Sequence, residues 1–169
     1  ATPDGSMVAA QVVEQWRKGA AIFVDVVGVG SSVYDALSGS YEVYAVSGGE
    51  AAGYPTGKRF TDKPGNLEFT NLRSWMIWRF REMLDPESGL NLYLPPDSKM
   101  KADLCAPRWK LTPPISSSQA KGRIQVESKD DIKKRLGRSP DRGDAIVYAS
   151  LDVEFFSVGR QFGSSRAYW

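Results

Sequence analysis

The chain has 169 residues, of which 41% are hydrophobic and 25% charged, and its net charge is +2. These values predict one globular domain with a single buried core rather than a strongly basic nucleic-acid-binding protein. The sequence has no histidine and one cysteine, which excludes Ser-His-Asp and Cys-His catalysis, zinc-histidine sites and a disulfide within the chain. Carboxylates, lysines and oxygen-ligated hard cations such as Mg²⁺ or Mn²⁺ are the catalytic groups that remain.

Membrane insertion is not expected. No apolar run approaches the roughly 20 residues that a membrane-spanning helix needs. The first residues also lack the basic and then apolar pattern of a secretory signal.

The first predicted element is a helix that begins at Pro3. Thr2 is its expected cap, and Lys18-Gly19 has the residue types of a helix end. One face of this helix is apolar, formed by Val8, Val12, Val13 and Trp16.

The next stretch, residues 21–37, is the most informative part of the chain. The apolar run 21–27 predicts a strand buried on both faces, and one carboxylate, Asp25, interrupts it. Gly28 and Gly30 predict a tight turn before a helix. Acids at this end of a strand in an open α/β sheet occur at active sites, but Asp25 could equally cap the turn.

Alternation over residues 42–46 predicts a second strand, parallel to the first, with residues 29–41 as the crossover. Residues 47–69 are rich in Gly, Pro, Thr and Lys and predict a long loop. Within that loop, residues 53–59 are similar to a phosphate-binding loop. The spacing is one residue short and no Ser or Thr follows Lys58, so we do not expect an ATP site.

The strongest helical pattern spans residues 71–84 and ends before Pro86. Its apolar stripe is expected in the core, with Arg73, Arg79 and Arg81 largely off it. Further predictions are a short strand at 90–94, a helix at 97–105 with Met100, Leu104 and Cys105 inward, a loop at 111–119 and a strand at 122–127. Two more helices begin at Ser128 and Ser139, and Ser139 is the expected cap of the second one. Residues 152–169 form an aromatic and glycine-containing tail.

Two separated segments resemble the nuclease domain of bacteriophage large terminases. Phe23-Val-Asp25-Val-Val-Gly28-Val-Gly30, with Val33-Tyr-Asp35-Ala-Leu37, is similar to that domain's second-strand motif. The second segment is similar to that domain's C-terminal metal-binding helix. It comprises Glu127-Ser-Lys129-Asp-Asp131 through Lys134-Arg135, followed by Ser139-Pro-Asp141-Arg-Gly-Asp144-Ala145. Asn71-Leu-Arg73 resembles the family's middle region, so order and spacing agree over roughly residues 1–150.

The resemblance implies an α/β, ribonuclease-H-like fold, in which helices flank a mixed sheet that lacks its first strands at the N-terminus. Residues 1–169 would form a single nuclease domain, with 152–169 as its tail. The implied function is metal-dependent cleavage of double-stranded DNA during genome packaging, in the cytoplasm of a bacterial host. Besides DNA, the implied partners are the portal protein and the small terminase subunit.

The resemblance also implies the site residues. Asp25, Asp144 and Asp141 are the expected catalytic residues and ligands of Mg²⁺ or Mn²⁺, in a two-metal-ion mechanism. Asp25 matches the second-strand acid, Asp144 the last ligand, and Asp141 a further or supporting ligand one turn earlier. Glu127 and Asp130 are alternative ligands, although Asp130 fits a capping role better. The family's first acid, which lies on an opening strand, and its ATPase domain have no match in this sequence.

Basic side chains near the acids are expected to contact DNA phosphates, unless they form only a solvated helix face. They are Lys129, Lys133, Lys134, Arg135, Arg138 and Arg142, with Lys58 and Arg59 on the long loop.

Two other functions stay open. The chain could be a catalytically incomplete ribonuclease-H-like module that binds DNA or packaging partners, as the missing first acid suggests. It could also be a nucleotide-binding α/β domain that uses the Gly28-x-Gly30 turn at a helix N-terminus. The third glycine and the ribose-binding acid of such domains are absent.

Overall fold

The computed structural model describes residues 4–54, 57–90, 92–114, 121–153 and 155, and these residues form a mixed α/β structure. The described helices are α1 (Gly5–Gln15), α2 (Gly30–Ser38), α3 (Leu72–Met83), α4 (Ser98–Cys105), α5 (Lys129–Leu136) and α6 (Asp141–Ala149), with a 3-10 turn η1 (Pro86–Ser88). The described strands are β1 (Ile22–Asp25), β2 (Val43–Val46), β3 (Glu68–Phe69), β4 (Trp109–Thr112) and β5 (Arg123–Val126).

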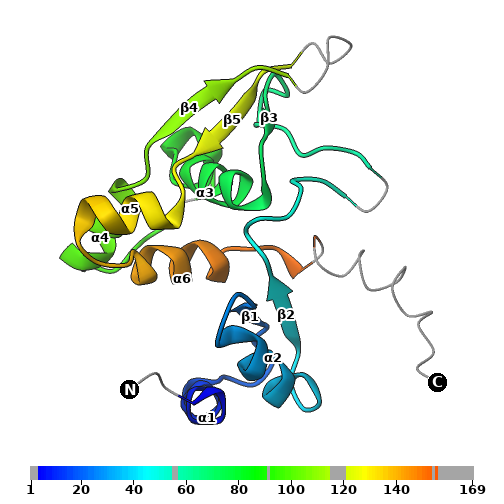
Figure 1. Cartoon of the computed structure of the whole chain (residues 1–169), viewed down its shortest axis with the longest axis vertical. Coiled ribbons are helices and arrows are strands. Elements are labelled where there is room, and N and C mark those ends of the chain that lie inside the picture. Colours follow the sequence, from blue (N-terminus) through cyan, green and yellow to red (C-terminus); the bar gives the residue numbers. More distant parts are fainter. Residues whose placement is uncertain (1–3, 55–56, 91, 115–120, 154, 156–169) are drawn as a thin grey trace.

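The elements are arranged in two parts, each with its own small sheet (Figure 1). The lower part consists of α1, α2 and the parallel pair β1–β2. The upper part contains α3, α4, α5 and a three-stranded sheet in the order β3–β5–β4. Helix α6 runs between the two parts and contacts α3 and α4 above and β1 below. The contacts of α6 with both parts place its side chains where the parts meet.

The lower part confirms the predicted strand–helix–strand unit. β1 and β2 are parallel, in a register that pairs Ile22 with Val43 and Asp25 with Val46. Helix α2 is the crossover, and α1 packs against it over a small core of buried apolar side chains, namely Ala9, Val33, Leu37 and Val43. The prediction that β1 is buried on both faces is wrong, because all four of its residues are only half-buried. The next section describes the hollow that adjoins them.

Gly30 is required where α2 begins against the end of β1. A Cβ atom at this position would lie 1.6 Å from the carbonyl oxygen of Asp25 and 2.8 Å from its carbonyl carbon. Backbone atoms cannot rotate away, so only glycine allows this close approach. The Gly28-x-Gly30 turn is therefore explained by packing, and Gly28 itself has a positive φ of 71°.

The upper part holds the larger core. β5 is its central strand, parallel to β3 and antiparallel to β4, and Ile124 and Val126 on β5 are buried. Helix α3 covers this sheet with Trp75, Met76 and other apolar side chains. Its N-cap is Asn71, whose side chain accepts a hydrogen bond from the backbone of Ser74. The predicted core helix and the predicted strand at 122–127 are both confirmed.

Several local predictions are wrong. Residues 111–112 belong to β4 and not to a loop, and no strand forms in the described part of 90–94. Cys105 is exposed, because the helix 97–105 turns Asp103 inward instead. Helix α6 has Pro140 and not Ser139 at its cap position. Thr2, the expected cap of α1, lies outside the described residues, and Asp4 caps that helix.

The described strands do not form the single mixed sheet that was expected, since β1–β2 and β3–β5–β4 are separate. Most of the tail, 152–169, lies outside the described residues, but Phe155 packs against Phe60 and Trp75. None of the helices in the described part of the chain is long and apolar enough to span a membrane.

Candidate functional site

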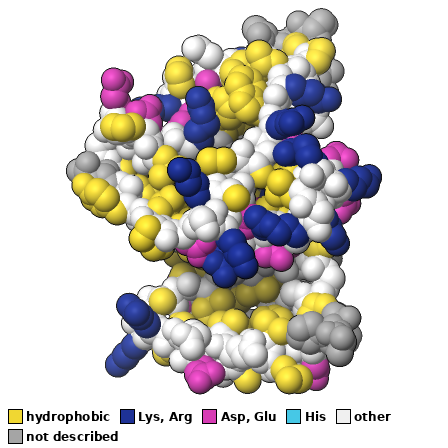
Figure 2. Space-filling model, turned by 90° about the vertical axis from the view of Figure 1, so that its left-hand side faces the viewer, with side chains coloured by type: hydrophobic (Ala, Val, Ile, Leu, Met, Phe, Trp, Pro, Cys, Tyr) yellow, Lys and Arg dark blue, Asp and Glu magenta, His cyan; other side chains and the backbone are white. Residues whose placement is uncertain are grey.

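A hollow separates the lower part from α6, and the three predicted metal ligands line it. It has a volume of about 720 Å³, with walls from α1, β1 and α6, and it includes Asp25, Asp141 and Asp144. Figure 2 shows it as a cleft between the two parts, with hydrophobic side chains inside. Ile22, Phe23 and Asp25 of β1 line this space, which leaves these residues only half-buried.

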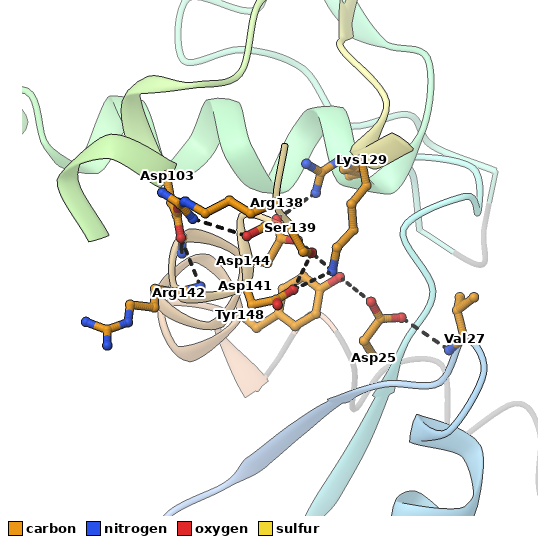
Figure 3. Close-up of polar contacts among 12 residues, drawn as sticks. Asp25, Val27, Asp103, Lys129, Arg138, Ser139, Asp141, Arg142, Asp144 and Tyr148 are labelled. Atoms are coloured by element: carbon orange, nitrogen blue, oxygen red, sulfur yellow. Dashed lines mark hydrogen bonds and ion pairs between the residues drawn. The ribbon is translucent and has the colours of Figure 1, made fainter. Parts of the chain in front are cut away.

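Asp25 enters the hollow from the end of β1. One carboxylate oxygen accepts a hydrogen bond from the backbone N–H of Val27 at 3.2 Å, which is the turn-capping role. The other accepts a hydrogen bond from the Tyr148 hydroxyl at 3.4 Å. Asp25 therefore caps its turn and also contacts α6 (Figure 3).

Tyr148 lies one helical turn after Asp144, on the same face of α6. Burial, followed by the negative charges of Asp25 and Asp144, raises the pKa of the Tyr148 hydroxyl far above its usual value. The hydroxyl therefore stays protonated and donates to Asp25.

Asp144, in the first turn of α6, is held between two cations. Its exposed fraction is 9%. One oxygen lies 2.8 Å from Nη1 of Arg73 on α3, and the other lies 3.0 Å from Nζ of Lys129 on α5. Because an unpaired buried charge is costly, these two contacts offset the burial of the Asp144 carboxylate and fix its position.

Asp141 is more exposed and shares Lys129 with Asp144, at an Nζ–Oδ1 distance of 3.4 Å. A hydrogen bond from Ser139 is the main reason why the pKa of Asp141 is lowered; partial burial raises it, and the Lys129 charge lowers it further. Partial burial acts to lower the pKa of Lys129, but the hydrogen bonds and charges of Asp144 and Asp141 raise it overall. Figure 3 shows the ammonium group directed at both carboxylates.

These carboxylates have the chemistry of a hard-cation site, because they offer only oxygen donors. The Lys129 ammonium already bridges two of them, so a positive charge fits at that point. Within the described residues, no three Asp, Glu, Cys or His side chains are grouped closely enough to hold an ion together. Mg²⁺ commonly keeps several water ligands and needs only one or two carboxylates. That Asp25 and Asp144 share a cation stays a prediction, although both face the same hollow.

Asp103 anchors the end of α6 that carries the acids. It has an exposed fraction of 2% and accepts hydrogen bonds from the backbone N–H groups of Arg142 and Gly143, at 3.2 and 3.4 Å. A Cβ atom on Gly143 would lie 2.8 Å from the Cβ of Asp103, so α4 and α6 are in close contact here. Arg138 forms an ion pair with the same carboxylate at 2.5 Å.

Sequence reasoning assigned no site role to Arg73 or Asp103. Arg73 was expected largely off the apolar face of α3, but only 12% of its side chain is exposed. Asp103 follows the buried Met100 by three residues, one helical turn on. That spacing places Asp103 on the buried face of the helix and could have identified it, because a buried carboxylate needs a hydrogen-bond or ion-pair partner.

Most of the predicted DNA-binding residues are already paired with acids. Lys129 pairs with Asp141 and Asp144, Lys134 with Asp131, Arg135 with Glu127, Arg138 with Asp103, Arg142 with Asp97 and Arg59 with Glu68. Lys133 and Lys58 are exposed. The first six residues of the predicted set lie on α5, α6 and their connection, whereas Lys58 and Arg59 lie between β2 and β3. Whether any of them contacts DNA stays a prediction.

The alternative ligands have other contacts. Glu127 accepts two hydrogen bonds from Arg135, which are the main reason why its pKa is lowered. The cap of α5 is Ser128, so the capping role expected for Asp130 is wrong. Asp130 lines a second hollow, of about 650 Å³, together with Asp25, Arg73, Lys129 and Tyr148.

No protein-family model matches the chain. No curated protein matches its sequence.

Proposed function

We propose that this chain is a metal-dependent endonuclease that cleaves double-stranded DNA, as the nuclease part of a phage or prophage large terminase with a ribonuclease-H-like fold. The proposal starts from the two motifs that resemble this family. One observation carries it further. Asp25, at the end of β1, and Asp144, on α6, are far apart in the sequence and line one hollow, with Tyr148 between them.

Asp25 and Asp144 would supply carboxylate ligands to Mg²⁺ or Mn²⁺, with Asp141 as a further or supporting ligand and water completing the coordination. When bound, such ions supply the activated water and the stabilisation of the leaving oxygen that phosphodiester hydrolysis requires. The other residues orient the ligands. Tyr148 directs one oxygen of Asp25 by donating a hydrogen bond, and Arg73 holds one oxygen of Asp144 from α3.

The second candidate is a catalytically incomplete module of the same fold that binds DNA or packaging partners. The observation that favours it is the charge balance at Asp144, where Arg73 and Lys129 already neutralise both oxygens. In that case the cluster would be a structural ion-pair network, and the hollow would serve recognition only.

Nicking of supercoiled plasmid DNA in Mn²⁺ separates these candidates. The nuclease predicts that nicking is lost in Asp25→Asn and in Asp144→Asn. We expect at least about a 100-fold decrease, because loss of supporting residues around a metal alone costs about 10- to 100-fold. Asp35→Asn, which changes an exposed carboxylate on α2, is the matched control and should nick as the wild type does.

Retarded migration of DNA without nicking would support the binding module instead. Nicking that persists in both site variants would assign the activity to a contaminant and contradict the proposal.

A further inference from the structure

The two cations that hold Asp144 differ in their freedom to move. The Arg73 side chain is 12% exposed, and its Nε and Nη2 atoms are buried without a hydrogen-bond partner among the described residues. Gly48 packs against it, since a Cβ there would lie 3.2 Å from the Cβ of Arg73. Arg73 is therefore enclosed and fixed by its packing.

Lys129 is bound in a different way. It is the first residue of α5, and 39% of its side chain is exposed. It lines both the hollow that holds the three acids and the second hollow beside Arg73. A lysine side chain has a flexible four-carbon stem, so the ammonium group can leave Asp144 for the second hollow without moving α5.

The place that the ammonium group occupies is the place where a divalent cation would bind. Nζ lies 3.0 Å from Asp144 and 3.4 Å from Asp141, the two acids of α6. Arg73 contacts Oδ1 of Asp144, so Oδ2 is the oxygen that an incoming ion could take, and Lys129 contacts that atom.

We propose that Lys129 sets the affinity of this site for divalent cations, as a tethered positive charge that an ion has to displace from Asp144. The inference rests on the proposed nuclease function and adds a regulating residue to it. Without an ion, Lys129 neutralises a buried carboxylate. With an ion bound, the released ammonium faces the second hollow, whose lining includes the carboxylates of Glu127, Asp130 and Asp131. The site thus exchanges one cation for another and is never left with an unpaired Asp144.

The test measures Mn²⁺ binding directly, from the electron paramagnetic resonance signal of free Mn²⁺ without DNA. Lys129→Met should bind Mn²⁺ about tenfold tighter than the wild type, because the competing charge is gone. Lys129→Arg keeps the positive charge, so it should bind Mn²⁺ no more tightly than the wild type does. Lys101→Met removes an exposed lysine on α4 and matches the change in net charge; its affinity should equal that of the wild type.

The double variant Lys129→Met with Asp144→Asn tests whether the ion binds at Asp144. Without the Asp144 carboxylate, the tenfold gain in Mn²⁺ affinity from Lys129→Met should disappear. Equal affinity of Lys129→Met and Lys101→Met would overturn the inference and leave the nuclease proposal standing. The same conclusion follows if the gain persists without the Asp144 carboxylate. Absence of Mn²⁺ binding in the wild type and in Lys129→Met would overturn both proposals.

Discussion

Asp25 and Asp144 line the same hollow, but the parts of the molecule that carry them hold them differently. Asp25 has two neutral hydrogen-bond donors, the Val27 backbone and the Tyr148 hydroxyl. Asp144 lies between two cations, on a helix whose beginning is anchored by the buried Asp103. The comparison separates two ways of keeping a carboxylate in place. Neutral donors orient it and leave its charge available, whereas cations stabilise the charge and compete with any ligand.

The largest effect is expected when Arg73, the fixed cation beside Asp144, is removed. Arg73→Met should lower the free energy of unfolding by about 3 kcal/mol, because it removes one partner of a buried ion pair and leaves Asp144 with Lys129 alone. Urea denaturation measures this loss. In Arg73→Met combined with Asp144→Asn, no unpaired charge remains, so the loss should be smaller than the sum of the single losses. Strict additivity would show that the two side chains do not interact.

The next effect concerns the anchor of α6. Asp103→Ala removes the acceptor for two backbone N–H groups and should cost about 2 kcal/mol in urea denaturation. Arg138→Ala should cost less, because the 44% exposed guanidinium can be replaced by water and the two backbone N–H groups still hold the buried Asp103 carboxylate. If Arg138→Ala were as costly as Asp103→Ala, the ion pair and not the helix anchor would be the main contribution.

A smaller effect is expected on the Asp25 side. Tyr148→Phe removes one hydrogen bond, and at 3.4 Å this bond is long, so the expected loss is about 0.5 kcal/mol. Val27 still orients Asp25. Tyr93→Phe, at a side chain with an exposed fraction of 87%, is the control and should leave stability unchanged. A loss of several kcal/mol in Tyr148→Phe would mean that neutral donors hold Asp25 as firmly as cations hold Asp144.

The smallest expected effect is a dependence of stability on pH through Asp141. Its pKa is lower in the folded chain than in the unfolded chain. Its contribution is therefore present above the unfolded pKa of about 4 and is lost as the pH falls through the folded pKa. Asp141→Asn should reduce the decrease in melting temperature between pH 5 and pH 3, as followed by circular dichroism. Identical slopes in the wild type and the variant would show that Asp141 contributes nothing to this decrease.

Local patterns were sufficient to predict much of the fold. The apolar run before Gly28 and the stripe after Asn71 specify β1 and α3 through the spacing of neighbouring residues alone. β4 was missed because Trp109, Lys110 and Leu111 are all exposed, so no alternation between buried and exposed residues marks the strand. The separation into two sheets depends on pairing between distant strands, which the spacing within one segment does not encode.

The difference between local patterns and contacts between distant segments also applies to the candidate site. Asp25 and Asp144 could be selected because each lies in a recognisable local context, a strand end and a helix start. Arg73 became a site residue only through Asp144, 71 positions later, and Asp103 through the backbone of residues 142 and 143. Such contacts depend on how α3, α4 and α6 pack together, and no motif within one of these helices contains that information.

The close approach of α2 to β1 at Gly30 also has a consequence for evolution. With 1.6 Å between a would-be methyl carbon and the carbonyl oxygen of Asp25, alanine could be accepted only if the whole helix shifted. Such a shift would also move the backbone of Asp25 and the wall of the hollow. Selection on the position of one carboxylate would therefore constrain a neighbouring residue that has no side chain.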